Sequence, residues 1–130
     1  MKVIISGSAK LPGAIELWVQ YWNSQSGHTV IDHPKTIPPT NFDELYPEVF
    51  KSFFRNIAKA DILFVANEPK NSIGGYIGAG TFAELSFGLA QKLIHGQNIQ
   101  LVLAHLPDEQ VPCHDEIIRW LKLGWIEILA

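Results

Sequence analysis

Short apolar runs alternate along the chain with longer segments whose apolar residues recur at helical spacing. The clustering of β-branched and other apolar residues predicts five strands, at residues 2–6, 26–32, 61–66, 98–104 and 125–129. The segments between the strands carry apolar residues at i, i+3, i+4 and i+7, which predicts four helices, beginning at Pro12, at Asn41 or Asp43, at Thr81 and at Cys113.

This alternation of strands and helices predicts an α/β fold, because parallel strands need crossover connections that helices supply. We expect a flavodoxin-like, doubly wound sheet of five parallel strands in the order 2-1-3-4-5, with helices on both faces. A chain of 130 residues suits one domain, spanning residues 1–130. In such sheets ligands bind beyond the carboxyl ends of the strands, which gathers the loops at residues 6–12, 33–40 and 67–80.

Composition narrows the classes of function. Lysine and arginine are scattered and the net charge is −3, which argues against a nucleic-acid polymer as partner. No run of about 18 apolar residues predicts a membrane span, and Lys2 leads into a strand without the layout of a signal peptide. The single cysteine, Cys113, excludes an intrachain disulfide, so we expect a cytoplasmic protein.

The histidines and the cysteine do not predict a metal or thiol site. The five histidines lack metal-ligand spacing, so we expect neither metal nor cofactor. Cys113 and His114 are neighbours on a predicted helix and point apart, which argues against a catalytic pair. The four tryptophans are expected in the core or at a subunit interface.

The stretch "GGYIGAGTFAELSFG" at residues 74–88 holds five of the ten glycines. Glycines ahead of a helix leave backbone N–H groups unshielded, which favours an anion cradle. The stretch has neither the Lys-Ser/Thr ending of a P-loop nor the dinucleotide-binding spacing, so phosphate and sugar are both open. Glu84 has two interpretations: it completes a capping box with Thr81, or it serves a ligand that approaches over the bare helix face at Gly88.

The same residues carry a resemblance. The segments "ADILFVAN" (60–67) and "GGYIGAGTFAELSFGLAQ" (74–91) resemble the core motif of the nucleoside 2-deoxyribosyltransferase-like proteins. "VIISGSAKL" (3–11) is similar to the first strand and Gly-Ser turn of that superfamily, and residues 98–129 resemble the C-terminal part of its short members. "GTFAE" (80–84) also resembles the Gly-Thr-x-x-Glu of the cytokinin-activating nucleotide phosphoribohydrolases.

The resemblance implies a chemistry for Glu84. In both families the helix-start glutamate acts at the sugar, which makes Glu84 the candidate nucleophile or oxocarbenium stabiliser. Departure of a nucleobase builds positive charge at C1′, and a nearby carboxylate stabilises that charge or bonds covalently. A ribosyl ester passed to a second base gives transfer, and one passed to water gives hydrolysis, without a metal.

The candidate substrate-binding residues lie in the predicted site loops. Ser8 is a donor to phosphate or ribose, or else a solvated turn serine; Lys10 neutralises a phosphate or is simply solvated. Asn67 and Tyr76 are placed to bond or stack on a base. The backbone of the remaining candidates forms the predicted cradle: Gly7, Gly75, Gly78, Gly80 and Thr81.

Departures from the family pattern keep three functions open. The chain has no acid in "KSFFRN" (51–56), has Gly78 six residues before Glu84 where the families have Asp or Ser, and has Ile4 in place of an aromatic residue. The protein is therefore a deoxyribosyltransferase-like enzyme, a nucleoside-monophosphate N-glycosidase, or a sensing module without the acid–base helpers. The expected partner is a small nucleoside or nucleotide, and the resemblance implies a homodimer or higher homo-oligomer.

Overall fold

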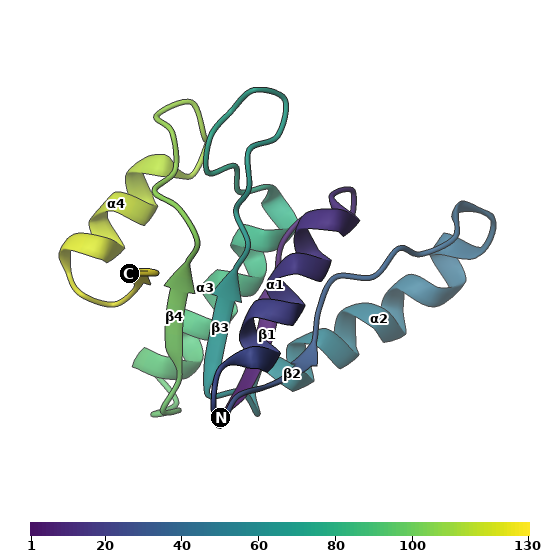
Figure 1. The fold of residues 1–130 in the computed structure, drawn as a ribbon, viewed down its shortest axis with the longest axis horizontal. Coiled ribbons are helices and arrows are strands. Elements are labelled where there is room, and N and C mark those ends of the chain that lie inside the picture. The colour runs from purple at the N-terminus through teal and green to yellow at the C-terminus, as the bar shows by residue number, and fades with distance from the viewer.

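A computed structural model describes residues 1–130 and places five parallel strands in one sheet, in the order β2-β1-β3-β4-β5 (Figure 1). This confirms the predicted flavodoxin-like topology. Strand β1 (Lys2–Ser6) has its predicted bounds. The other four strands are shorter than their predicted ranges, because only part of each range pairs with a neighbouring strand: β2 (Thr29–Asp32), β3 (Ile62–Val65), β4 (Gln100–Leu103) and β5 (Glu127–Ile128).

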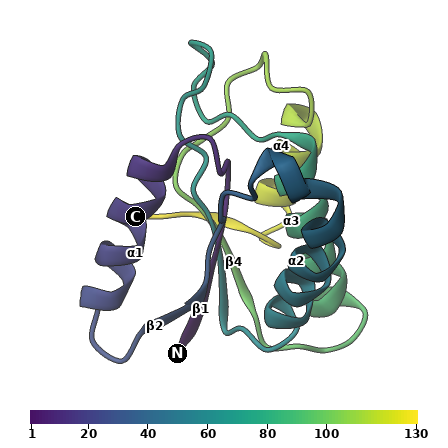
Figure 2. The same ribbon diagram turned by 90° about the vertical axis from the view of Figure 1, so that its right-hand side faces the viewer.

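Four helices cover the sheet, together with a short 3₁₀ helix at Pro39–Asn41. Helix α1 lies on one face, whereas α2, α3 and α4 lie on the other (Figure 2). Pro12 opens the first of them, as expected for a residue whose missing N–H has no helical partner there. The bounds are α1 (Pro12–Ser24), α2 (Phe42–Ile57), α3 (Ala79–Leu93) and α4 (His114–Lys122).

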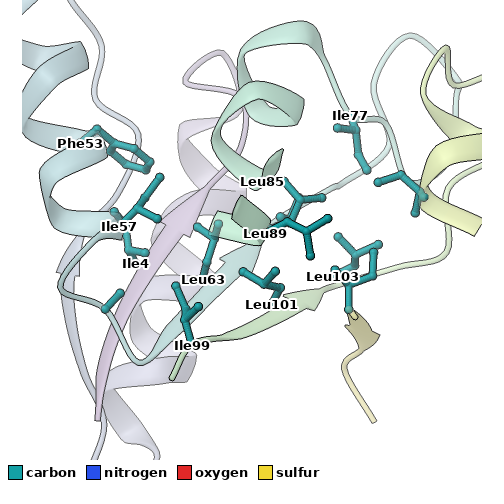
Figure 3. Close-up of a cluster of buried hydrophobic side chains, with 14 of the residues drawn as sticks. Ile4, Phe53, Ile57, Leu63, Ile77, Leu85, Leu89, Ile99, Leu101 and Leu103 are labelled. Atoms are coloured by element: carbon teal, nitrogen blue, oxygen red, sulfur yellow. The ribbon is translucent and has the colours of Figure 1, made fainter. Parts of the chain in front are cut away.

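Successive side chains of the strands point to opposite faces of the sheet, so they contribute to two apolar cores. The larger core lies between the sheet and the three helices, where Leu63 and Leu101 pack against Leu85 of α3 (Figure 3). The smaller core lies under α1 and contains Phe64 and Trp22. β3 is buried along its whole length, which explains its uninterrupted apolar sequence. The other three tryptophans are partly buried and pack against these two cores: Trp18, Trp120 and Trp125.

Helix α3 begins at Ala79, two residues before the predicted start at Thr81. Gly78 takes the N-cap position in an extended conformation, and no side chain caps the helix. Thr81 is therefore the third helical residue, and Glu84 lies in the second turn. A capping box needs its threonine at the N-cap, so the capping-box interpretation of Glu84 is wrong.

Candidate functional site

Two adjoining pockets open at the carboxyl ends of β1, β2 and β3. Their volumes are about 680 Å³ and about 370 Å³. The two pockets share three lining residues, Gly7, Gly80 and Glu84. The loops after β1 and before α3 therefore meet at one place, with the Glu84 carboxyl group between the two pockets.

The sheet holds the Glu84 side chain through Ser6. The Ser6 hydroxyl, at the end of β1, donates a hydrogen bond to Glu84 Oε1 at 2.5 Å. Ser6 is fully buried, and its carbonyl accepts a hydrogen bond from the Ala66 N–H, so β3 fixes the backbone that carries the hydroxyl. Glu84 Oε2 makes no hydrogen bond to the protein. Sequence reasoning missed Ser6. Its position could have indicated a site residue, because it places a hydroxyl at the end of a buried apolar strand.

Burial raises the pKa of Glu84 to about 7, from an ordinary value of 4.5. The hydrogen bond from Ser6 opposes this shift because it favours the charged form, and the negative charge of Asp32 adds to it. Because removal from water disfavours the charged carboxylate, a positive centre that formed beside Glu84 would stabilise its anionic form.

The larger pocket is lined by aromatic side chains of α2 and by residues of the loop after β2. From α2 these are Phe42, Tyr46, Phe50 and Phe53. Residues 32–37 also line this pocket, together with Lys10, whose side chain is exposed. Flat apolar walls of this kind fit a planar aromatic group.

Asp32 is a second carboxylate in the larger pocket that sequence reasoning missed. It is 8% exposed, and Asn56 Nδ2 donates to its Oδ2 at 2.9 Å. Its Oδ1 accepts the His33 N–H at 2.9 Å and lies 3.2 Å from Lys35 Nζ. Asn56 comes from the α2 segment that lacks an acid, so the folded chain brings a carboxylate from β2 to that region.

The smaller pocket joins a lysine to the start of α3. Lys70 Nζ lies 3.4 Å from Ser8 Oγ and 5.4 Å from the ring centroid of Tyr76. A tight turn with Asn71 and Ser72 at positive φ brings Lys70 back toward this site. Lys70 was missed by sequence reasoning because only the turn conformation directs it to the glycine-rich segment.

Eight of the ten predicted site residues line one or both pockets: Glu84, Gly7, Ser8, Lys10, Tyr76, Gly78, Gly80 and Thr81. Asn67 and Gly75 do not. The buried Asn67 amide donates to the carbonyls of Gly75 and His105, and its oxygen accepts the His105 N–H. Gly75, at φ +61, lies where an added Cβ would collide with the Leu106 carbonyl. Both residues hold the glycine loop against the loop after β4.

Gly88 serves packing against the sheet. A Cβ there would lie 2.8 Å from a methyl carbon of Leu63 and 2.9 Å from one of Leu101. The bare helix face predicted to admit a ligand is therefore filled by strands β3 and β4. The close approach of α3 to the sheet places Glu84, one turn earlier, within reach of Ser6.

No three His, Cys, Asp or Glu side chains gather as metal ligands. Burial raises the pKa of the Cys113 thiol, and His114 Nδ1 bonds Asp115, so these neighbours do not form a pair. None of the helices is long and apolar enough to cross a membrane. Neither a family model, nor a curated protein, nor a solved structure matches the chain.

Proposed function

We propose that this protein binds a nucleoside or nucleotide across the two pockets and cleaves or transfers its N-glycosidic bond, with Glu84 at C1′. One observation carries the proposal: the partly buried carboxyl group of Glu84 lies where an aromatic pocket meets a smaller polar pocket. A planar base suits the first pocket and a phosphate or sugar hydroxyls suit the second. The sugar then spans the junction, beside the carboxyl group.

The proposed reaction uses Glu84 in its ionised form. As the bond between C1′ and the base nitrogen breaks, its electron pair leaves with the base and positive charge grows on the sugar. Ser6 holds Oε1, which leaves Oε2 as the oxygen free to stabilise that charge or to form an ester with C1′. Water or a second base then attacks C1′ and releases the carboxylate.

Lys70 favours a nucleoside monophosphate over a nucleoside. It supplies the positive charge of the smaller pocket, beside the Ser8 hydroxyl and the first residues of α3. The N-terminal N–H groups of a long helix and a lysine both favour an anion. This supports the N-glycosidase form of the proposal, in which the 5′-phosphate binds here.

A sensing module is the second candidate, and Asp32 favours it. The leaving base needs a proton, and both oxygens of this carboxylate are already engaged by donors. Both oxygens of Asp32 therefore already act as acceptors, and neither is free to contact the leaving base. A protein that binds a nucleotide without cleaving it would need no such donor.

A screen against nucleosides and nucleoside monophosphates tests both candidates. Thermal shift reports binding, and chromatography with mass spectrometry reports release of the free base. For the enzyme, Glu84→Gln should keep binding and lower turnover at least about 100-fold, whereas the surface variant Glu109→Gln should retain both. Binding by the wild type without release of base supports the sensor, and the absence of binding to every compound refutes the proposal.

A further inference from the structure

The larger pocket holds two carboxyl groups that repel each other. Asp32 and Glu84 both line it, and the negative charge of Asp32 adds to the effect of burial in raising the pKa of Glu84. Lys35 Nζ lies 3.2 Å from Asp32 Oδ1, but the lysine side chain is 63% exposed and the carboxylate 8%, so solvent screens the positive charge more than the negative one. A positively charged group of a ligand would relieve the repulsion between the two carboxylates.

Aromatic rings of α2 supply a second attraction for a cation in the same pocket. Phe42, Tyr46 and Phe50 are spaced i, i+4 and i+8, and the centroids of successive rings lie 5.4 Å and 5.7 Å apart. All three side chains line the pocket, and each is 43–45% exposed, so ring surface remains for a ligand to cover. The face of an aromatic ring carries partial negative charge and attracts a cation, and the ring also stacks on a planar group. The rings and carboxylates together favour a planar group with a positive charge.

The same pocket is poorly equipped to give a proton to a leaving base. A neutral base leaves a sugar readily only when an acid protonates it. Both oxygens of Asp32 already accept hydrogen bonds, and His33 donates from Nδ1 to the Pro34 carbonyl at 3.0 Å, so the neutral ring keeps Nε2 as an acceptor. The other side chains of the pocket that carry ionisable protons are hydroxyl and ammonium groups, which are far weaker acids than a carboxyl group.

A base that is joined to C1′ through a positively charged nitrogen needs no proton in order to leave. When the bond breaks, both of its electrons pass to that nitrogen, cancel its charge and release the base as a neutral molecule. Pyridinium bases and purines alkylated on the ring belong to this class. Water then adds to C1′ and gives up one proton to the solvent, so the products are the neutral base, the sugar phosphate and a proton.

We propose that the substrate is a nucleoside monophosphate whose base carries a fixed positive charge, with the cationic base in the larger pocket and the phosphate in the smaller one. This inference rests on the proposed function and names its substrate class. The two ends of such a ligand differ in charge as the two pockets do. Asp32 and the rings of α2 attract the base, Lys70 attracts the phosphate, and Glu84 lies between them.

Pairs of nucleotides that differ in the charge of the base test the substrate class. Nicotinamide mononucleotide has a cationic pyridinium ring, and its reduced form has a neutral ring of nearly the same shape. Guanosine monophosphate methylated at N7 and the unmethylated nucleotide form the purine pair. The wild type should release the cationic base at least about 100-fold faster than its neutral counterpart, and Glu84→Gln should abolish the release.

Affinity measured on Glu84→Gln separates recognition of the charge from the lability of the bond, because this variant should bind without turnover. By calorimetry the cationic member of a pair should bind about tenfold more tightly than the neutral one. Tyr46→Leu with Phe50→Leu should remove most of this preference. The same kind of change at Phe82, which stacks on Trp120 outside both pockets, should retain it. Circular dichroism reports whether each variant keeps the fold.

The outcomes separate this inference from the proposed function. Release of base from one cationic nucleotide alone assigns a pyridinium or a purine substrate, and release from both assigns the shared class. The inference is overturned if the neutral nucleotides are cleaved as fast as the cationic ones, if both pairs bind with equal affinity, or if no cationic base is released; the proposal of a nucleotide site stands in each case. Failure of all four nucleotides to bind removes the nucleotide site as well.

Discussion

Replacing Glu84 by Gln tests whether the protein holds this carboxyl group at a cost in stability. Burial raises the pKa of Glu84 to about 7 in the folded chain, from an ordinary 4.5. The hydrogen bond from Ser6 lowers this pKa in part, and the negative charge of Asp32 raises it further. Between these two values the folded protein binds a proton at Glu84 that the unfolded chain has lost. The stability of the wild type therefore falls as pH rises through this window, and the loss is complete above about pH 7.

The magnitude follows from the difference in pKa. Each unit corresponds to about 1.4 kcal/mol, so the cost approaches about 3 kcal/mol at pH 8 and is less than about 1 kcal/mol at pH 5. Glutamine has nearly the same shape, accepts the hydrogen bond from Ser6 and is uncharged in both states. The free energy of unfolding of Glu84→Gln should therefore exceed that of the wild type by these amounts.

Urea unfolding followed by tryptophan fluorescence at pH 5, 6, 7 and 8 measures the difference. With a slope of about 2 kcal/mol per molar, the urea midpoint of Glu84→Gln should lie about 1–2 M above that of the wild type at pH 8. Glu109→Gln removes one exposed carboxylate and controls for net charge; it should show no such gap. A variant no more stable than the wild type at pH 8, or a gap that does not change with pH, would refute the reasoning.

Three further changes test other parts of the site. Lys70→Gln should lower the affinity for nucleoside monophosphates about tenfold, measured by calorimetry, and leave the affinity for nucleosides unchanged. An equal loss of affinity for both would contradict the assignment of the phosphate to the smaller pocket. Ser6→Ala should raise the pKa of Glu84 further and move the acid limb of the pH–rate profile up by about one unit, which a purely structural role would not do. Gly88→Ala should lower the free energy of unfolding by about 1–3 kcal/mol despite the better helix propensity of alanine. The control Gly13→Ala, a helical position with open space around it, should be neutral or stabilising in the same urea titration.

The order of the strands was predictable because short apolar runs alternate with amphipathic helical segments, and the crossover rule leaves few topologies for such a chain. The rule that ligands bind beyond the carboxyl ends of parallel strands placed the glycine segment at that edge of the sheet, which is why most of the predicted residues line the pockets. The start of α3 was wrong because the Thr81-x-x-Glu84 pattern matches a capping box by residue type alone. Gly78 and Gly80 have low helix propensity, so nothing local indicated an earlier start.

The hydrogen-bond partners of Glu84 and Asp32 were not predictable from the local sequence pattern. Ser6 and Glu84 are separated by 78 residues, and their hydrogen bond depends on how closely α3 packs on the sheet. Asp32 and Asn56 come from different elements and meet only across the edge of the sheet. Lys70 depends on two residues at positive φ, a conformation that Asn71 permits but that Ser72 does not signal.

The link between Asn67 and the loop after β4 bears on when the site forms during synthesis. A ribosome delivers the N-terminal part of a chain first, and the glycine loop emerges before its support does. Asn67 hydrogen-bonds the backbone of His105, and Gly75 packs against Leu106. Both partners lie in the last third of the chain, so neither contact can form until that part has been synthesised. A nascent chain that stops before β4 should carry Glu84 on an unsupported loop and helix. The candidate site around Glu84 thus forms late in folding, once β4 and the loop that follows it are in place.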